Sequence, residues 1–218
     1  MNTPARRPYR SELRSQQSDL TRSHVAQTAA ELFVRDGYAG TTVVGVAREA
    51  GVSAQTVYNT FGTKAALLKT AYDITLAGDA APVPLAERPE VRALYAEPDA
   101  AAFLRGYARL GRQVADRVGP LMLLIISGAG AGDPDLVALR DTTNTERLRG
   151  TTMVAQRVAD LGALDSGRTL TGARDRIWTL NSIEVWHLLT GTLGWSGEAY
   201  QEWIGDAMCA ATLRRELW

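Results

Sequence analysis

Apolar residues that recur every three or four positions restrict the fold of this 218-residue chain more than any other feature. That spacing lines them up on one face of a helix, whereas a half-buried strand needs strict alternation. Residues 20–36 are the first such stretch, and Gly37 follows where a helix would end. Their apolar face is formed by Val25, Ala29, Leu32 and Phe33. The sequence contains no alternating runs bounded by hairpin turns, so it predicts an all-α protein.

Three short helices are expected next, and each begins at a Ser or Thr whose side chain can cap it. They cover residues 43–50 after Thr41 or Thr42, 54–61 after Ser53, and 64–76 after Thr63. Gly51 ends the first of them, so the turn Gly51-Val52-Ser53 joins two short helices. Two helices joined in this way are a candidate helix-turn-helix, whose second helix enters the major groove of DNA.

Charge is distributed unevenly, although the net charge of the whole chain is zero. Residues 1–64 contain eight basic and five acidic side chains, an excess of three positive charges. No aspartate or glutamate occurs between Ala50 and Tyr72. A basic region beside an acid-free stretch suits a polyanionic partner such as a nucleic acid.

The helix expected at residues 54–61 has side chains that suit such a partner. Val57 and Phe61 are four residues apart and can anchor it to the core. The side chains left to point outward are Gln55, Thr56, Tyr58, Asn59 and Thr60. Glutamine and asparagine can hydrogen-bond adenine, and hydroxyl groups suit phosphate oxygens.

Lys64 is the first residue of the following helix, where the helix dipole disfavours a cation. Its place there makes sense if a DNA phosphate docks at this helix end. A solvated surface lysine is the alternative, and the neighbouring helix-turn-helix candidate favours the phosphate contact.

The order and spacing of these residues resemble the TetR family of transcriptional regulators over about residues 20–68. The motifs that carry the resemblance are Leu32-Phe33, Gly37-Tyr38, Thr41-Thr42, Val46-Ala47, Ala50-Gly51-Val52-Ser53, Thr56-Val57-Tyr58, Phe61, Lys64 and Ala66-Leu67-Leu68. The resemblance implies an all-helical homodimer with an N-terminal three-helix DNA-binding domain and a larger helical domain for ligand binding and dimerisation. Two residues depart from the family pattern. Val44 replaces a base-reading polar residue of some members, and Gly45 lies inside a short helix.

By position, the resemblance implies base contacts from Gln55, Thr56 and Asn59. It implies phosphate contacts from Thr42, Tyr58, Thr60 and Lys64. The expected domains are a flexible basic arm at residues 1–19, which can become helical near its end, the helix-turn-helix domain at 20–68, and the ligand-binding and dimerisation domain at 69–218. The arginines of the arm that suit the DNA minor groove are Arg6, Arg7, Arg10 and Arg14.

A proline-rich segment, residues 78–97, separates the short helices from longer ones. The longer helices are expected at residues 99–118, 120–127, 134–162, 171–194 and 198–215. The helix at 171–194 is apolar almost all round, so it is expected to be buried on more than one side. We expect these last two helices to pair with their copies in a homodimer. The alternative is that both simply form the core of one chain.

A small-molecule effector is expected to bind in the C-terminal domain, where a mostly apolar pocket would carry a few fixed polar groups. The polar groups most expected to be enclosed by apolar surface are Asn181, Glu184 and His187. The candidate walls, each of which is otherwise plain core, are Phe103, Tyr107, Met122, Met153 and Trp178. Arg149 is considered as a partner for an acidic ligand, but a solvated helix face is the favoured interpretation.

No metal, cofactor or catalytic site is expected. The Glu-x-x-His spacing of Glu184 and His187 occurs once, whereas a carboxylate metal site needs a second copy. Cys209 is the single cysteine and is expected to be structural. The sequence has no Gly-x-Ser-x-Gly elbow and no catalytic cysteine–histidine set, so an enzyme is not expected.

Together these features predict a ligand-responsive dimeric repressor that a small molecule releases from a palindromic operator in double-stranded DNA. The alternative is a helical interaction protein of the same fold without sequence-specific DNA reading. The longest apolar run, residues 121–126, is far too short to span a bilayer, and the N-terminus lacks the apolar segment of a secretory signal. A cytoplasmic protein is therefore expected.

Overall fold

The computed structural model describes residues 8–78, 83 and 87–218, with side chains from Gln17 onward. Within these residues the chain is helical, and the one strand-like pairing is an isolated bridge between Leu164 and Leu213. The all-α class expected from the apolar spacing is confirmed. In the described part of the chain, no helix is long and apolar enough to cross a membrane.

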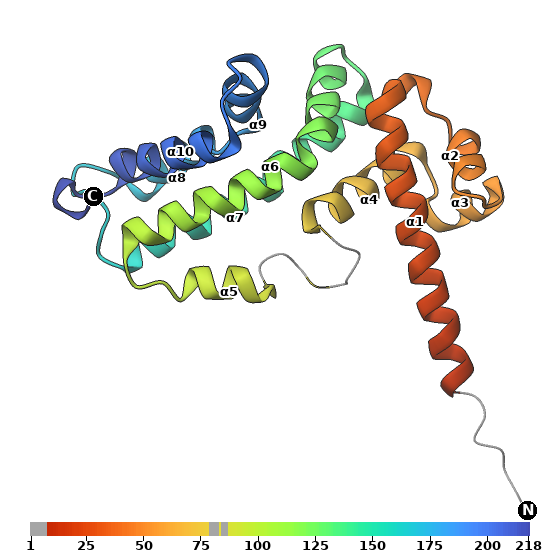
Figure 1. Cartoon of the computed structure of the whole chain (residues 1–218), viewed down its shortest axis with the longest axis horizontal. Helices are drawn as coiled ribbons and strands as arrows, with labels where there is room; N and C mark the ends of the chain where they lie inside the picture. The colour runs from red at the N-terminus through yellow and green to blue at the C-terminus, as the bar shows by residue number, and fades with distance from the viewer. Residues whose placement is uncertain (1–7, 79–82, 84–86) are drawn as a thin grey trace, which may run out of the picture. The chain divides into compact units, whose positions relative to one another are not determined.

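The chain divides into two compact units between residues 81 and 82. The first unit contains α1 (Pro8–Gly40), α2 (Val43–Glu49), α3 (Ala54–Phe61) and α4 (Lys64–Ala77). Within it, α4 packs along α1, and the α2–α3 pair lies against these two helices (Figure 1). The domain boundary predicted between residues 68 and 69 falls inside α4. Because α4 packs on α1, the boundary lies beyond the end of α4 instead.

Side-chain caps begin the three short helices of the first unit. Thr42, Ser53 and Thr63 each accept a hydrogen bond from the backbone N–H three residues further on, at 3.0, 3.0 and 3.1 Å. Thr41 is buried instead, and its hydroxyl donates to the Leu32 carbonyl oxygen at 3.1 Å. Thr42 is therefore the cap of α2, and the other two predicted caps are confirmed.

The first helix is longer than the apolar pattern predicts. That pattern begins the helix near residue 20 and assigns residues 1–19 to a flexible arm, whereas α1 begins at Pro8. The sequence of these first turns is almost entirely polar, so apolar spacing cannot detect them. Gly37, at a φ of 76°, interrupts α1 where the sequence predicts its end. The side chains of Arg6, Arg7, Arg10 and Arg14 lie outside the described residues, so their minor-groove role stays a prediction.

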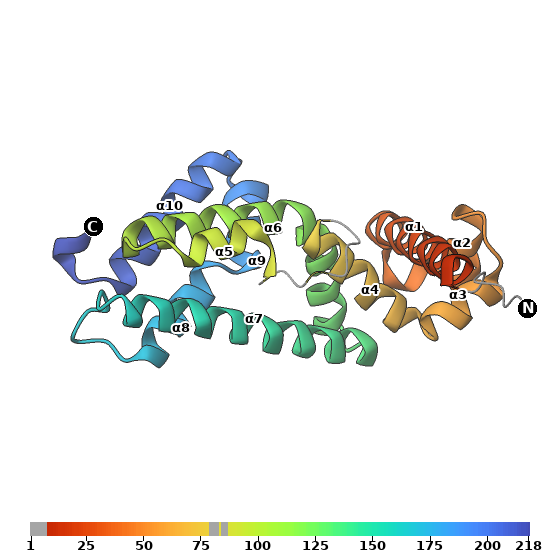
Figure 2. The ribbon, with the colours of Figure 1, turned by 90° about the horizontal axis from the view of Figure 1, so that it is seen from below.

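The second unit has its own hydrophobic core. Its elements are α5 (Pro89–Tyr95), α6 (Ala100–Gly130), α7 (Pro134–Asp160), α8 (Leu170–Leu180), α9 (Ile183–Trp186), the π-helix η2 (His187–Thr192), α10 (Gly197–Thr212) and the 3-10 helix η3 (Arg215–Leu217). The long helix α6 packs against α7 and α10, and α8 packs against the same two helices (Figure 2). The side chains buried among these helices include Phe103, Leu104, Val158, Ile177, Ile204 and Met208.

Two predicted helices of this unit are one. The stretches expected at residues 99–118 and 120–127 form the continuous α6, although Pro120 lies inside it. An interior proline costs a helix about 3 kcal/mol, because it removes a hydrogen bond and crowds the preceding turn. The residues around it favour the continuous helix, since their side chains are buried: Val118, Leu121, Met122 and Ile125.

The helix predicted at residues 171–194 is broken. The first part, α8, ends at Leu180, and its capping residue Asn181 has a non-helical ψ of 35°. Ser182 then caps α9, and from His187 the chain continues as a π-helix. A π-helix has a wider turn than an α-helix, so side chains beyond Trp186 leave the faces that a period of about 3.6 residues predicts.

Trp186 holds this broken segment against α6. A Cβ added to Gly119 would lie 2.4 Å from Cζ3 of Trp186, so the indole occupies space that only a glycine leaves. The indole Nε1 donates a hydrogen bond to Oδ1 of Asp116 at 3.1 Å, and Arg112 donates to the other oxygen of that carboxylate at 2.9 Å. Arg112 also donates to Gln201 at 3.1 Å. This network joins α6, α9 and α10.

Replacing Gly119 with alanine tests this packing. We expect G119A to lower the free energy of unfolding by about 1–3 kcal/mol, because the added methyl group displaces Trp186. Gly150 in α7 is the matched control, since nothing lies within 4 Å of a Cβ added there. G150A should instead raise the free energy of unfolding by about 0.5–1 kcal/mol through helix propensity. Urea unfolding followed by tryptophan fluorescence measures both, and equal effects would contradict the packing.

Candidate nucleic-acid interface

Two apolar side chains fix α3 to the first unit. Val57 and Phe61 are 1% and 8% exposed. The outward side chains are Gln55, Tyr58 and Asn59, which are exposed, and Thr56 and Thr60, which are partly exposed. The predicted division of α3 into an anchoring face and an outward face is therefore confirmed.

Hydrogen bonds order the outward face of α3. Gln55 Nε2 donates to Oδ1 of Asn59 at 2.7 Å, so the two side-chain amides lie together one helical turn apart. The Thr60 hydroxyl donates to the Thr56 carbonyl oxygen at 2.8 Å, and the hydroxyl groups of Ser53 and Thr56 lie 2.8 Å from each other. Hydrogen bonds within the chain thus give these polar side chains defined positions before any other molecule binds.

Lys64, at the start of α4, lies over Tyr38 of α1. Its Nζ donates a hydrogen bond to the Tyr38 carbonyl oxygen at 2.9 Å and lies 4.0 Å from the centre of the tyrosine ring. Lys64 is partly buried, so it is not simply a solvated surface lysine. An ammonium group has three donors, and the bond to Tyr38 uses one of them. The contact of Lys64 with a phosphate stays a prediction.

The start of α2 presents two further side chains to solvent. Thr42 is exposed while its hydroxyl oxygen caps the helix. Val44 is 62% exposed, like several other single apolar side chains of the described residues. The exposed part of this helix-turn-helix therefore combines the polar side chains of α3 with one apolar side chain of α2.

Two acidic side chains near this region, Asp36 and Asp73, are paired with bases. Asp36 accepts a hydrogen bond from Arg35 at 2.8 Å, which lowers the pKa of the carboxyl group. Asp73, just beyond the acid-free stretch, pairs with Lys69 at 2.5 Å. Lys64 differs because its partner is a neutral carbonyl, which leaves its positive charge in place.

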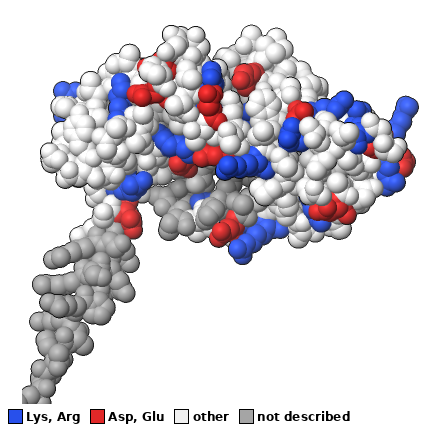
Figure 3. Space-filling model, turned by 180° about the vertical axis from the view of Figure 1, so that it is seen from behind, with Lys and Arg blue, Asp and Glu red and all other residues white. Residues whose placement is uncertain are grey.

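Charge elsewhere on the molecule is mixed. The face drawn in Figure 3 shows lysine and arginine side chains interspersed with aspartate and glutamate. Ion pairs at the surface of the described residues include Arg105 with Asp206 at 3.0 Å and Arg140 with Asp141 at 2.8 Å. That face therefore has no continuous surface of one charge sign to which a strongly charged partner could bind.

Known proteins resemble this chain in both sequence and fold. Residues 26–71 match the model of the bacterial regulatory proteins of the tetR family. A complex of SmeT with triclosan is 17% identical, with 91% of this chain and 94% of that chain covered and a TM-score of 0.66. A TetR transcriptional regulator from Chloroflexus aurantiacus is 18% identical over 91% of this chain and 98% of its own, with a TM-score of 0.63.

A protein from Saccharomonospora viridis in complex with choline is 19% identical, with 89% of this chain and 98% of that chain covered and a TM-score of 0.65. No curated protein sequence matches the chain. The matched residues 26–71 run from α1 through α2 and α3 into α4. The chain is therefore a helix-turn-helix protein with the fold of the transcriptional regulators. Its first unit matches the model of the tetR family at residues 26–71, where the sequence motifs indicated the resemblance.

The predicted effector-pocket residues have different environments. Those that are buried or partly buried are Phe103, Tyr107, Met122, Trp178 and Asn181. Those that are exposed are Met153, Glu184 and His187. The expectation that apolar surface encloses Glu184 and His187 is wrong for the single chain. The break after α8 and the following π-helix remove both residues from the face that a continuous helix would bury.

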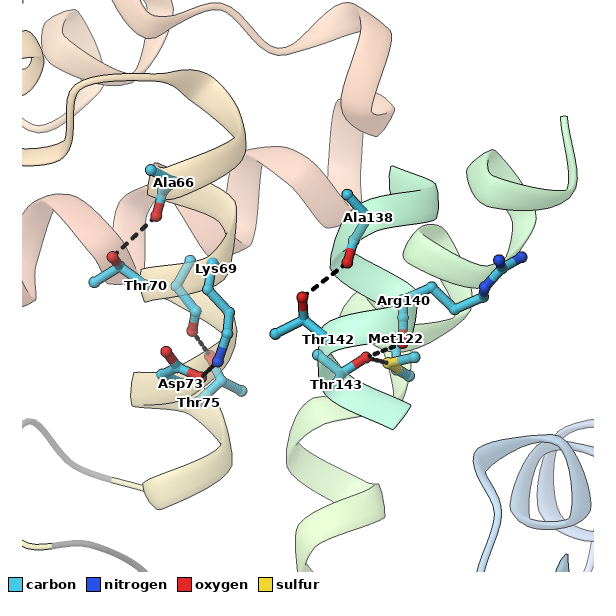
Figure 4. Close-up of polar contacts among 11 residues, drawn as sticks. Ala66, Lys69, Thr70, Asp73, Thr75, Met122, Ala138, Arg140, Thr142 and Thr143 are labelled. Atoms are coloured by element: carbon cyan, nitrogen blue, oxygen red, sulfur yellow. Dashed lines mark hydrogen bonds and ion pairs between the residues drawn. The ribbon is translucent and has the colours of Figure 1, made fainter. Parts of the chain in front are cut away.

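Met122 belongs to the contact between α6 and α7. The Thr143 hydroxyl group donates to the Met122 sulfur at 3.9 Å and to the Arg140 carbonyl oxygen at 2.9 Å (Figure 4). Met122 and Thr143 are both buried. This methionine is therefore core, which is the alternative that the sequence left open.

Arg147 of α7 is an inward-facing cation that the sequence pattern did not single out. Its guanidinium carbon lies 4.0 Å from the centre of the Trp178 ring, and the group donates a hydrogen bond to the Trp178 carbonyl oxygen. Arg149 is exposed, as the favoured interpretation expected. The sequence did contain one sign of this position. Arg147 lies four residues from both Thr143 and Thr151, so all three share the face of α7 on which the two threonines are buried.

A cleft of about 410 Å³ lies along α5 and α6. Its lining combines the apolar Leu94 and Leu110 with the charged Glu97 and Arg109. None of the predicted pocket residues lines it. The sequence could not indicate this cleft, because α5 lies in the proline-rich segment interpreted as a linker.

Apolar side chains are exposed where η2 leads into α10. They are Leu188, Leu193, Trp195 and Trp203. The rings of Trp195 and Trp203 meet edge to face, with centres 6.2 Å apart. Other residues of α10, namely Tyr200, Ile204 and Met208, are buried in the core of their own unit. A partner could therefore cover only part of the last two predicted helices, because other apolar residues of theirs are already buried within the unit.

Cys209 of α10 has a structural role in this core. It is fully buried, and its thiol donates a weak hydrogen bond to the Ala101 carbonyl oxygen at 3.8 Å. Burial raises the pKa of the thiol from 9.0 to about 11. Below that pH the folded protein keeps the group protonated, which disfavours nucleophilic or redox chemistry.

The raised pKa of Cys209 predicts a pH-dependent contribution to stability. In the unfolded chain the thiol loses its proton above pH 9.0, whereas the folded chain keeps it to about pH 11. The contribution is therefore fully present below pH 9 and is lost as the pH rises toward 11. We expect the loss of unfolding free energy in C209A, relative to wild type, to shrink from pH 8 to pH 11. A loss that grows over this range in chemical unfolding would contradict the assignment.

Proposed function

We propose that this chain is a homodimeric, ligand-responsive transcriptional regulator, a repressor that a small molecule releases from a palindromic DNA operator. The observation that supports this best is the outward face of α3. It exposes hydrogen-bonding side chains on a helix anchored by Val57 and Phe61, and no acid occurs between Ala50 and Tyr72. Such a helix can enter the major groove without charge repulsion. We accordingly infer a cytoplasmic location, where the DNA is accessible.

Two groups of side chains share the work of binding in this proposal. Contacts to the bases come from Gln55, Thr56 and Asn59. Contacts to phosphates come from Thr42, Tyr58, Thr60 and Lys64. Phosphate contacts fix the position of the protein on the duplex, and base contacts select the sequence. The bond between Lys64 and Tyr38 supports this assignment, because it holds the cation at the start of α4.

The dimer would form through the exposed apolar surface around η2 and the start of α10. Burial of apolar area stabilises an interface by roughly 25 cal/mol per Å², so these side chains favour association with a second copy. A two-fold dimer presents two α3 helices to two half-sites of a palindrome. The two-fold symmetry of the dimer is the reason that we propose a palindromic operator.

The effector would bind in the second unit. Solved structures with this fold include complexes with triclosan and with choline. In this chain, two separate places are candidates. The Arg147–Trp178 pair offers a cation and an aromatic ring, and the cleft along α5 and α6, which neither of these residues lines, offers a mixed apolar and charged lining. Release requires that the effector bind the DNA-free state of the dimer more tightly, and a coupling of about 1–3 kcal/mol is typical.

Removal of the charge at the start of α4 tests the DNA contact. The chain has only two lysines, Lys64 and Lys69, and both lie on α4. We expect K64A to weaken duplex binding and to reduce the slope of log K against log salt by about one, because one phosphate contact is lost. K69A is the matched control, since Lys69 is paired with Asp73 (Figure 4). Fluorescence anisotropy over a salt series measures both slopes.

An equal change of slope in K64A and K69A would show that general charge, and not the proposed phosphate contact, is responsible. Failure of the wild-type protein to prefer DNA from its own upstream region over random DNA would favour the interaction protein without sequence reading. In that case the double variant Y58A/K64A should retain the cellular function of the protein.

A charged substitution at the exposed apolar surface tests the dimer. We expect L193E to shift the full-length protein toward the monomer, because Leu193 is 60% exposed in the single chain and would be buried between two copies. Leu20 of α1 is the control, as it is 71% exposed but lies in the first unit. Sedimentation equilibrium should show L20E to associate like the wild type. A dimer of unchanged affinity in L193E would contradict this interface.

A further inference from the structure

We infer that the operator half-site of this protein consists mainly of A·T base pairs and that Gln55 and Asn59 read one adenine as a joined unit. This inference rests on the DNA-binding function proposed above and names the sequence class that the same surface selects. It depends on three features of the helix-turn-helix: the hydrogen bond between the two amides, the absence of charged side chains from α3, and an exposed valine on α2.

The hydrogen bond between Gln55 and Asn59 determines which of their amide atoms remain available to a partner. Gln55 Nε2 donates to Asn59 Oδ1 at 2.7 Å, which leaves Gln55 Oε1 as an acceptor and Asn59 Nδ2 as a donor. In the major groove, adenine presents the complementary N6–H donor and N7 acceptor. Guanine presents two acceptors there, so Gln55 Oε1 would face an acceptor without a hydrogen between them. The joined amides therefore favour adenine over guanine.

The side chains that usually read G·C pairs are missing from the same surface. Guanine is most often read by arginine or lysine, and cytosine can be read by aspartate or glutamate. Helix α3 contains none of these residue types, and neither does the first turn of α2. The nearest cations lie elsewhere: Arg48 is in the last turn of α2, and Lys64, at the start of α4, is bonded to Tyr38.

Val44 offers an apolar side chain that can contact the methyl group of thymine. Its side chain is 62% exposed in the first turn of α2, where the chain has an apolar residue in a polar setting. Thymine is the one base of the major groove that carries a methyl group, and apolar side chains contact it. Burial of Val44 against that methyl group would remove apolar surface of both partners from water. Gln55 with Asn59 thus favour adenine, and Val44 favours thymine.

The experiment begins with the full-length protein and a random library of duplex DNA. We expect selection to enrich sites whose half-sites are mainly A·T. Base analogues are then placed in the enriched site, one position at a time. Replacement of the adenine that the joined amides read by 7-deazaadenine, which lacks N7, should lower wild-type affinity by about tenfold. Q55A, N59A and the double variant should each show a similar, much smaller loss with the analogue, because either substitution breaks the unit.

A matched control comes from the second unit. Gln156 Nε2 donates to Oδ1 of Asp160 at 2.7 Å, which is the same kind of exposed bond one helical turn apart. Q156A should keep both the affinity of the wild type and its full sensitivity to 7-deazaadenine. Replacement of thymine by uracil, which lacks the methyl group, tests Val44 in the same way, with V44A expected to be insensitive.

The outcomes separate this inference from the proposed function. Enrichment of G·C-rich half-sites, DNA binding without enrichment of any sequence, or equal sensitivity of wild type, Q55A and N59A to 7-deazaadenine would each overturn the inference. All three results would leave DNA binding by the first unit intact. Absence of salt-dependent duplex binding by the wild type would instead contradict the proposed function.

Discussion

Burial of Val57 and Phe61 is the interaction on which the proposed DNA contact depends. An isolated helix of eight residues, the length of α3, is not stable in water. The two buried side chains hold α3 in place, and the Ser53 cap satisfies a backbone N–H at its start. Because these anchors lie four residues apart, the helical period determines which of the remaining side chains face outward. The orientation of the polar face is thus a consequence of packing.

The polar face is ordered by contacts that do not involve a partner. Gln55 is bonded to Asn59, and Lys64 is bonded to Tyr38. Side chains held in this way lose less conformational entropy when they bind than freely rotating ones do. The same contacts limit what the surface can recognise, since each fixes a donor or an acceptor. Affinity through Lys64 and selectivity through the joined amides therefore have separate structural origins.

The first unit could be predicted closely from the sequence because its signals are local. The starts of α2, α3 and α4 follow from the caps Thr42, Ser53 and Thr63, and each lies within a few residues of its cap in the chain. The sorting of α3 into buried and exposed residues follows from the same short range. The pattern could not show how early α1 begins, because its polar first turns have no apolar stripe.

The second unit resisted prediction where its signals are not local. The break at Asn181 and the π-helix after Trp186 change the phase of the chain, so extrapolation of one helical period misplaced Glu184 and His187. Beyond this break, Trp186 packs into the space at Gly119, which lies far away in the sequence. Arg147 was overlooked for a related reason, since its partner Trp178 is on another helix.

The most direct test of the account is photocrosslinking from the outward face of α3 to duplex DNA. A photoreactive residue in place of Asn59 should crosslink to DNA, and excess salt should suppress the product because phosphate contacts position the helix. The same residue in place of Met153, an exposed side chain of α7, should give no crosslink. Crosslinking from position 153 with none from position 59 would contradict the claim that α3 meets the DNA.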